Sequence, residues 1–331
     1  MQMSALAFVI GNPVTGIEFE ATGNAHGWPK ENVATDYIIG KLTLFFTARM
    51  DMLAPLTFNN HSRDSAGMKY VYPVVSRRAG GVSVGINLNT NNACNWACIY
   101  CQVPDLKRGT APEIDLLRLE TELRQFLLSA TSGDYLLRNA PPEARRLVDV
   151  AFSGNGEPTS THAFPEAVAI AGRVLDELGL STDVRLRLIT NGSFLHRAYV
   201  REGIAEIGER DGEVWFKIDR ASPPEIKRVN HVTTTPEKVK QAVLTCSRLA
   251  PTWVQTCLFA IDGCPISEQE FGAYLELISS IKDEIKGILL YGLARPSLQP
   301  EANRLSALST ESLFVFAHRI RELGVEVVAT P

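Results

Sequence analysis

Three cysteines lie within the run Ala93-Cys94-Asn95-Trp96-Ala97-Cys98-Ile99-Tyr100-Cys101, at C-x₃-C-x₂-C spacing. Thiolates at this spacing can hold three irons of a cubane [4Fe–4S] cluster, which leaves the fourth iron without a protein ligand. Clusters that only transfer electrons usually have four cysteine ligands, so three thiols indicate chemistry at an open iron. A structural zinc site is the alternative, but zinc usually takes four protein ligands, and no further Cys or His lies near this run.

The cysteine run follows a β-rich segment, Val82–Leu88, which is the first of a series. Segments with helical periodicity lie between the later β-rich segments, and alternating strands and helices predict a parallel sheet. Six or seven such units fit an α/β barrel, complete or open, with its chemistry at the carboxyl ends of the strands. The other expected strands are Leu147–Ser153, Val184–Thr190, Val214–Asp219, Trp253–Ala260, Ile288–Leu293 and a final candidate, Val325–Ala329. The expected helices are 114–130, 165–178, 236–249, 267–282 and 310–323.

Residues 1–80 have weak periodicity and many turn-forming residues. We expect them to form an irregular N-terminal extension of unknown role, with candidate strands at Leu42–Phe46 and Tyr70–Val75. Residues 81–331 then form the barrel.

Composition predicts a soluble, cytoplasmic protein. The 331 residues are 45% hydrophobic and 21% charged, and no apolar stretch approaches the roughly 20 residues that cross a bilayer. The N-terminus lacks the features of a signal peptide. Six cysteines, three of them in one motif, indicate a metal site in a reducing compartment. A net charge of −4 argues against a large nucleic-acid interface.

Glycine and polar residues follow the next strands. Gly154-Asn155-Gly156-Glu157-Pro158 comes after the second strand, where two glycines let the backbone approach a ligand and a carboxylate can receive an ammonium group. An ordinary Gly/Pro turn is the alternative. Asn191 follows the third strand, either as a ligand contact or as part of a turn.

Charged residues close two of the later strands. Alternation places Lys217 and Asp219 on one face of the fourth strand, where two charges inside a barrel must pair with each other or with a ligand. Arg295, after the sixth strand, could bind a carboxylate or a phosphate. The other thiols are Cys246, Cys257 and Cys264. Their spacing matches no compact cluster motif, so they are buried apolar residues, a second cluster, or one reactive thiol, for which Cys264 is the candidate.

These motifs together resemble the radical S-adenosylmethionine (SAM) superfamily. Cys94, Cys98 and Cys101 match its cysteine signature, and Asn155-Gly156-Glu157-Pro158 is similar to its SAM-binding "GGEP" motif. The resemblance covers roughly residues 70–331 and is closest to the Fe–S oxidoreductases related to wyosine-synthesis enzymes. The motifs shared with that branch are Ser76-Arg77-Arg78, Gly85-Ile86-Asn87-Leu88, Cys101-Gln102, the Gly154–Thr159 loop, Lys217-Ile218-Asp219 and Ala294-Arg295-Pro296.

The resemblance implies a partial (β/α)₆ barrel. It implies an enzyme, an oxidoreductase in the broad sense, in which SAM chelates the open iron and a reduced cluster splits SAM into methionine and a 5′-deoxyadenosyl radical. That radical would take a hydrogen atom from an unidentified substrate. Carried over by motif, Gly154, Gly156 and Glu157 would contact the methionine end of SAM and Tyr100 would lie near the adenine. Asn191 and Asp219 are candidates for its ribose or carboxylate.

Two other functions stay open from the sequence. The chain lacks the extra N-terminal cysteines of archaeal wyosine-type enzymes and the flavodoxin-like domain of the eukaryotic ones, so a tRNA substrate is an alternative to the small molecule that we expect. A non-catalytic cluster protein, either an electron carrier or a sensor, is the other alternative. As an enzyme, the chain would need an electron donor such as flavodoxin or ferredoxin, and no membrane partner is expected.

Overall fold

The computed structural model describes residues 55–57, 67–77 and 79–331, which lie within one compact unit. Most of the expected N-terminal extension, including the candidate strand Leu42–Phe46, lies outside the described residues.

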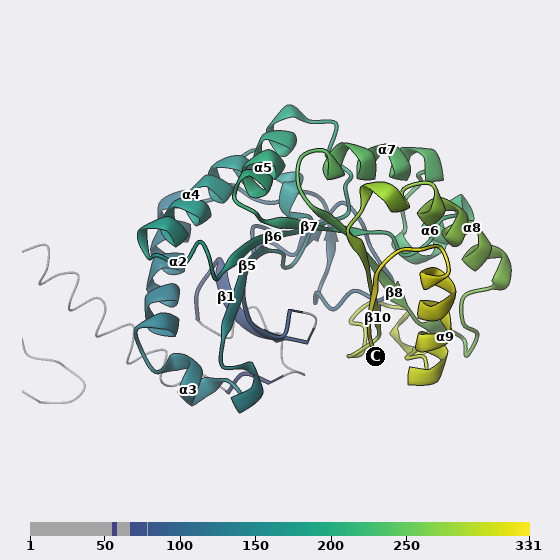
Figure 1. Cartoon of the computed structure of the whole chain (residues 1–331), viewed down its shortest axis with the longest axis horizontal. Coiled ribbons are helices and arrows are strands. Elements are labelled where there is room, and N and C mark those ends of the chain that lie inside the picture. The colour runs from purple at the N-terminus through teal and green to yellow at the C-terminus, as the bar shows by residue number, and fades with distance from the viewer. Residues whose placement is uncertain (1–54, 58–66, 78) are drawn as a thin grey trace, which may run out of the picture. The chain divides into compact units, whose positions relative to one another are not determined.

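An eight-stranded sheet, curled into a half-barrel, forms the centre of this unit (Figure 1). β1 pairs antiparallel with β2, and every later neighbour in the sheet pairs in parallel. The strands, in their order across the sheet, are β1 (Val71–Ser76), β2 (Gly81–Ile86), β5 (Leu147–Phe152), β6 (Arg185–Thr190), β7 (Glu213–Lys217), β8 (Thr252–Leu258), β10 (Gly287–Gly292) and β12 (Val327–Thr330). Two small sheets pair β3 (Ala93–Cys94) with β4 (Lys107–Arg108) and β9 (Ala260–Ile261) with β11 (Leu305–Ser306).

Helices cover the outer, convex face of the curled sheet (Figure 1). They are α2 (Leu116–Thr131), α3 (Tyr135–Asn139), α4 (Phe164–Glu177), α5 (Ala198–Glu209), α6 (Pro223–Asn230), α7 (Pro236–Ser247), α8 (Glu268–Ser279) and α9 (Thr310–Arg321). α2 shows why such segments form helices. The carboxylate of Asp115 caps its first turn by accepting the N–H of Arg118 at 3.0 Å, and its buried side chains recur at helical spacing on one face.

The strands have two chemically different faces. In β5 the outward side chains Val150 and Phe152 are fully buried in the main hydrophobic core, whereas the alternate residues Asp149 and Ala151 line the interior of the half-barrel. This alternation separates a dry layer of sheet and helices from a polar interior.

Charges paired with one another form part of that interior. The Arg187 guanidinium bonds Asp149 and Glu213, donating to the latter from Nε at 2.8 Å, and lies 4.8 Å from the Trp215 ring centroid. Burial raises the pKa of Asp149, and the charge of Arg187 opposes that rise. The pairing allows charged side chains inside the sheet.

The structure confirms the α/β fold and the predicted strands of the barrel. Each of the six main strands lies within about two residues of its predicted start and end. β1 forms the antiparallel edge of the sheet, although the sequence analysis placed its residues in the N-terminal segment. The helices α3, α5 and α6 were not predicted.

Candidate active site

A cavity of about 310 Å³ extends from the loops after the strands into the interior of the half-barrel. It brings together the motifs that the sequence analysis selected at separate strand ends. Those that line it are Cys94, Cys98, Tyr100, Cys101, Gly154, Gly156, Glu157, Asn191, Lys217, Cys257 and Arg295.

The cysteine loop follows β2 and folds back on itself. The N–H of Cys101 donates to the Cys98 carbonyl at 2.9 Å, and the N–H of Trp96 lies 3.4 Å from the Cys94 sulfur. The Asn230 side-chain amide lies 3.2 Å from the Cys98 sulfur. Burial raises the pKa of the Cys94 thiol to about 12, and burial also raises that of Cys98. A bound metal would supply the positive charge that stabilises the thiolate form of these sulfurs.

The three thiols suit a cluster better than a single ion. Within the described ranges, no three His, Cys, Asp or Glu side chains gather closely enough to hold one metal ion. In a cubane each cysteine ligates a different iron, so its sulfurs stand further apart than the ligands of a single zinc. Amide donation to a cluster sulfur, as Asn230 offers, is a known influence on cluster potential.

The glycine loop after β5 packs directly on the cysteine loop. A Cβ atom on Gly156 would lie 2.1 Å from the Ala93 carbonyl oxygen, and one on Gly154, where φ is +139°, would lie 2.5 Å from Asn87 Oδ1. The Asn155 side chain donates to Asn92 Oδ1 at 2.7 Å. The two loops thus form one wall of the cavity.

Glu157 joins that wall to β6. Its Oε1 accepts the hydroxyls of Thr159 and Thr190, each at 2.6 Å, and its Oε2 accepts the backbone N–H of Asn191 at 2.7 Å. The Asn191 amide in turn donates to Asn95 Oδ1, inside the cysteine run, at 2.9 Å. The Glu157 side chain is 3% exposed, and burial raises its pKa. These contacts fix the strand ends around the cavity.

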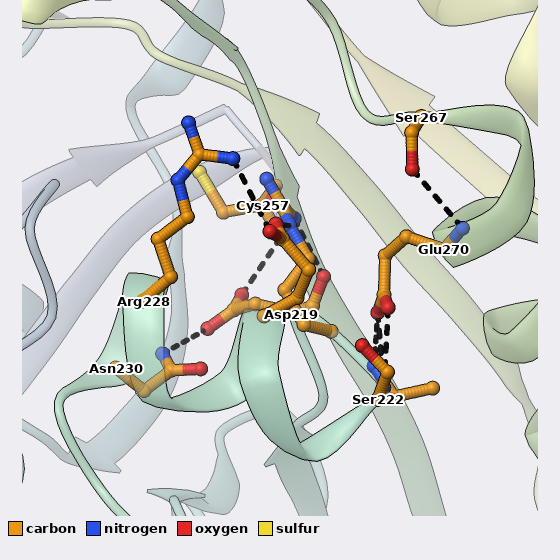
Figure 2. Close-up of polar contacts among 10 residues, drawn as sticks. Asp219, Ser222, Arg228, Asn230, Cys257, Ser267 and Glu270 are labelled. Carbon is orange, nitrogen blue, oxygen red and sulfur yellow. Dashed lines mark hydrogen bonds and ion pairs between the residues drawn. The ribbon is translucent and has the colours of Figure 1, made fainter.

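Asp219 is buried behind the cavity lining. Its carboxylate accepts the Asn230 amide at 3.0 Å and the N–H of Cys257 at 3.0 Å (Figure 2). It also accepts the Tyr100 hydroxyl at 2.6 Å. Burial raises the pKa of Tyr100 well above its ordinary value, and the Asp219 charge adds to the rise. Asp219 therefore holds Tyr100 and α6 in place from behind.

The turn after Asp219 is fixed by α8. The Glu270 carboxylate accepts the N–H groups of Ala221 and Ser222, at 2.6 and 3.2 Å, and its own N–H donates to Ser267 Oγ at 3.2 Å (Figure 2). Backbone donors bound in this way leave the chain at the end of β7 little freedom to move.

Lys217 and Asp219 are not joined by an ion pair. The Lys217 ammonium donates to the Tyr291 hydroxyl at 3.3 Å and lies 5.1 Å from the Tyr100 ring centroid. Lys217 lines the cavity and Asp219 does not, because β7 ends at Lys217 and the strand alternation stops there.

The remaining cysteines occupy three different environments. Cys246 is buried in the main hydrophobic core, Cys257 is buried beside the cavity, and Cys264 is exposed and is not part of the cavity lining. A catalytic role for Cys264, like a second cluster, stays a prediction.

Several residues that line the cavity, or contact its lining as Asn230 does, could not be selected from the sequence. Asn230 and Gln255 lie within a short helix and a central strand, and neither belongs to a recognisable motif. Asp149 and Arg187 had a signal, since each is a charge inside a segment predicted as a barrel strand.

Comparison with known proteins identifies the family. The sequence model of the radical SAM superfamily matches residues 88–278, more than half of the chain and the part that carries both cofactor motifs. The chain belongs to the radical SAM superfamily. As a member of this superfamily, the chain takes a [4Fe–4S] cluster and SAM as its cofactors. The likeness to the wyosine-synthesis branch stays a prediction.

Among curated relatives, the chain is 29% identical over 155 residues to "GTPase Obg" of Brachyspira hyodysenteriae, a match that covers 45% of this chain and 20% of the relative. It is 26% identical over 180 residues to "UPF0026 protein" of Helicobacter pylori, covering 54% of this chain and 51% of that protein. The radical SAM chain thus spans a fifth to a half of these relatives, and its sequence has no G-x-x-x-x-G-K-[ST] phosphate loop.

A solved structure supports the fold. A radical SAM methyltransferase from Sphaerobacter thermophilus is similar with a TM-score of 0.52 at 13% identity, over 78% of this chain and 68% of that one. At this identity the likeness concerns the partial barrel alone. No helix in the described part of the radical SAM chain combines the length and the apolar character that crossing a bilayer needs.

Proposed function

We propose that this chain cleaves SAM reductively and uses the resulting 5′-deoxyadenosyl radical to take a hydrogen atom from a small molecule held inside the half-barrel. The observation that carries the proposal is that one cavity is lined by Cys94, Cys98, Cys101 and the Gly154–Glu157 loop. When bound, the cluster and SAM would supply the electron and the radical.

The chain's own residues hold the cofactors in this proposal. Cys94, Cys98 and Cys101 would ligate three irons. Gly154 and Gly156, which place no side chain in the way, would let the backbone approach the methionine end of SAM.

Other residues of the cavity fix the position of SAM. Glu157 and Asn191 line the cavity while bonded to each other, so they present a fixed polar edge to SAM. Tyr100 would lie on the adenine side, with its hydroxyl held by Asp219. Such pre-organisation lowers the entropic cost of bringing the reacting atoms together. A small displacement of those atoms lowers the reaction rate strongly.

A small substrate is favoured over a nucleic acid. The cavity is about 310 Å³ and reaches inward to the paired charges of Asp149 and Arg187, so a compact molecule can lie within the half-barrel. With a net charge of −4, the chain does not have the excess of basic residues that is typical of nucleic-acid-binding proteins. The electron donor would be a flavodoxin or a ferredoxin.

The test is SAM cleavage by the purified protein. The chain is purified anaerobically, reconstituted with iron and sulfide, reduced with dithionite and given SAM, and the products are read by mass spectrometry. We expect 5′-deoxyadenosine and methionine from the wild type and none from Cys98→Ala. Cys264→Ala is the matched control and should still cleave SAM, because that exposed thiol does not line the cavity and a role in a later step would leave SAM cleavage intact. An intact cluster that leaves SAM uncleaved refutes the proposal, and tRNA that copurifies would favour the RNA alternative.

A further inference from the structure

The wall of the cavity formed by β7, β8 and β10 differs from the wall that holds the cofactor motifs. The cofactor loops follow β2, β5 and β6, whereas Lys217 on β7 and Gln255 on β8 are paired in register and both line the cavity. Because neighbouring strands lie about 4.8 Å apart, the two side chains leave the sheet side by side.

Gln255 is a buried polar side chain with an unused donor. Its exposed fraction is 2%, and within the described part of the chain its Nε2 atom has no hydrogen-bond partner. A buried donor left without a partner costs about 1–3 kcal/mol, so such groups in native proteins call for an explanation. A ligand that brings an oxygen to Nε2 removes this cost.

Lys217 supplies further donors at the same level. An ammonium has three N–H groups, and the contact described for Lys217 is one hydrogen bond to the Tyr291 hydroxyl, in addition to its approach to the Tyr100 and Tyr291 rings. Among the described residues, no carboxylate lies within the 4.0 Å of an ion pair with it. Asp219, two residues on, is bonded to Tyr100, Asn230 and the backbone of Cys257 instead.

We propose that Gln255 and Lys217 together bind a carboxylate of the substrate, which makes the substrate a small carboxylic acid. One carboxylate has two oxygens, each an acceptor, so it can take Nε2 of Gln255 on one side and Nζ of Lys217 on the other. This inference rests on the proposed function where it calls the bound acid a substrate. The anion site itself is inferred from the geometry of β7 and β8 alone. Trp215, two residues before Lys217 on the same strand, also lines the cavity and offers a flat apolar surface.

SAM also has a carboxylate, so two sources of the same group must be separated. If Gln255 and Lys217 bound SAM, substituting either would weaken SAM binding. If they bind the substrate, SAM binding stays unchanged.

The probe is benzoate, with the neutral benzamide as its isostere, and binding is followed by saturation-transfer NMR on the anaerobic, reconstituted protein with and without SAM. We expect benzoate to bind the wild type more tightly than benzamide does. Gln255→Leu and Lys217→Met should each weaken benzoate binding at least tenfold. Gln241→Leu, the same change at an exposed position of α7, should leave it unaltered.

Gln255→Glu keeps the size of the side chain and guards against a folding defect. The new carboxylate would pair with Lys217, so thermal unfolding should show a protein at least as stable as the wild type, while benzoate binding is lost. SAM affinity, read from the change in cluster absorbance, should stay within twofold in all four variants.

Three results overturn the inference: no benzoate binding by the wild type at 10 mM, equal binding by the wild type and Gln255→Leu, or a tenfold loss of SAM affinity in Gln255→Leu, which would assign the pair to SAM. If the protein fails to cleave SAM but benzoate binds as expected without SAM, the proposed function fails and the anion site remains.

Discussion

The contact between the glycine loop and the cysteine loop gives the sharpest prediction. In Gly156→Ala the new methyl group would lie 2.1 Å from the Ala93 carbonyl oxygen, and an ordinary contact begins at 3.4 Å. The Ala93 backbone, one residue before Cys94, would therefore have to retreat by about 1.3 Å, since a carbonyl cannot rotate away as a flexible side chain does. Overpacking of this kind costs about 1–3 kcal/mol, which is about 5- to 150-fold in an equilibrium constant.

We expect that cost to appear in cofactor binding. Gly156→Ala should bind SAM about 5- to 150-fold more weakly in anaerobic titrations of cluster absorbance, and should hold less iron after desalting. The control is Gly272→Ala in α8, where no atom beyond the neighbouring backbone of the helix itself lies within 4 Å of the new methyl group. Alanine in a helix interior should stabilise that variant by about 0.5–1 kcal/mol. Equal SAM affinity in Gly156→Ala and the wild type would refute the packing argument.

The remaining predictions concern the thiols, the interior charges and the glutamate of the cavity. Cys98→Ser should lose most of its iron after reconstitution while Cys264→Ser keeps it, measured by iron and sulfide assay; equal iron in both would remove Cys98 from the ligand set. Arg187→Met leaves Asp149 buried without its cation, so urea unfolding at pH 7 should show a loss of about 3–5 kcal/mol. Because burial already raises the pKa of Asp149 in the folded state, ionisation opposes folding, and the stability of Arg187→Met should be highest at low pH and fall as pH rises from about 4, the unfolded value, to the raised pKa. A deficit that is constant from pH 4 to 8 would contradict this. Glu157→Gln puts an NH₂ group among donors, which should cost about 1–3 kcal/mol of stability and weaken SAM binding, and a variant indistinguishable from the wild type in both measurements would argue against the role given to Glu157.

Much of the barrel could be predicted because its strands are short, apolar and regularly spaced. The missed helices had weaker local signals. α5 contains Gly203 and Gly208, which lower helix propensity. The structure gives the reason for both, because a Cβ on Gly203 would lie 2.5 Å from the Phe164 ring and one on Gly208 would lie 2.1 Å from the Leu249 carbonyl oxygen. The two glycines are therefore explained by close packing between α5 and its neighbours, and this packing leaves no pattern in the sequence.

The candidate active site likewise has parts that could be predicted from the sequence and parts that could not. Cysteine spacing and the Gly154–Glu157 loop are local patterns and could be found in the sequence. The partners of Asp219 could not be found, since Tyr100, Asn230 and Cys257 come from three separate segments that only the folded sheet brings together. Hydrogen bonds between distant segments leave no periodic trace in the sequence.

The cysteine loop is bonded to the glycine loop through Asn92 and Asn155, and to the loop after β6 through Asn95 and Asn191. Its link to the glycine loop has a consequence for maturation. Ordering either loop orders the other, so loading iron and binding SAM are linked equilibria, and each must favour the other by the same factor. Iron loading should therefore strengthen SAM binding, because it prepares the loop that receives SAM. Once SAM is bound, it should slow the loss of iron to chelators and oxygen, so the cellular supply of SAM would help decide how long each copy of the enzyme stays active.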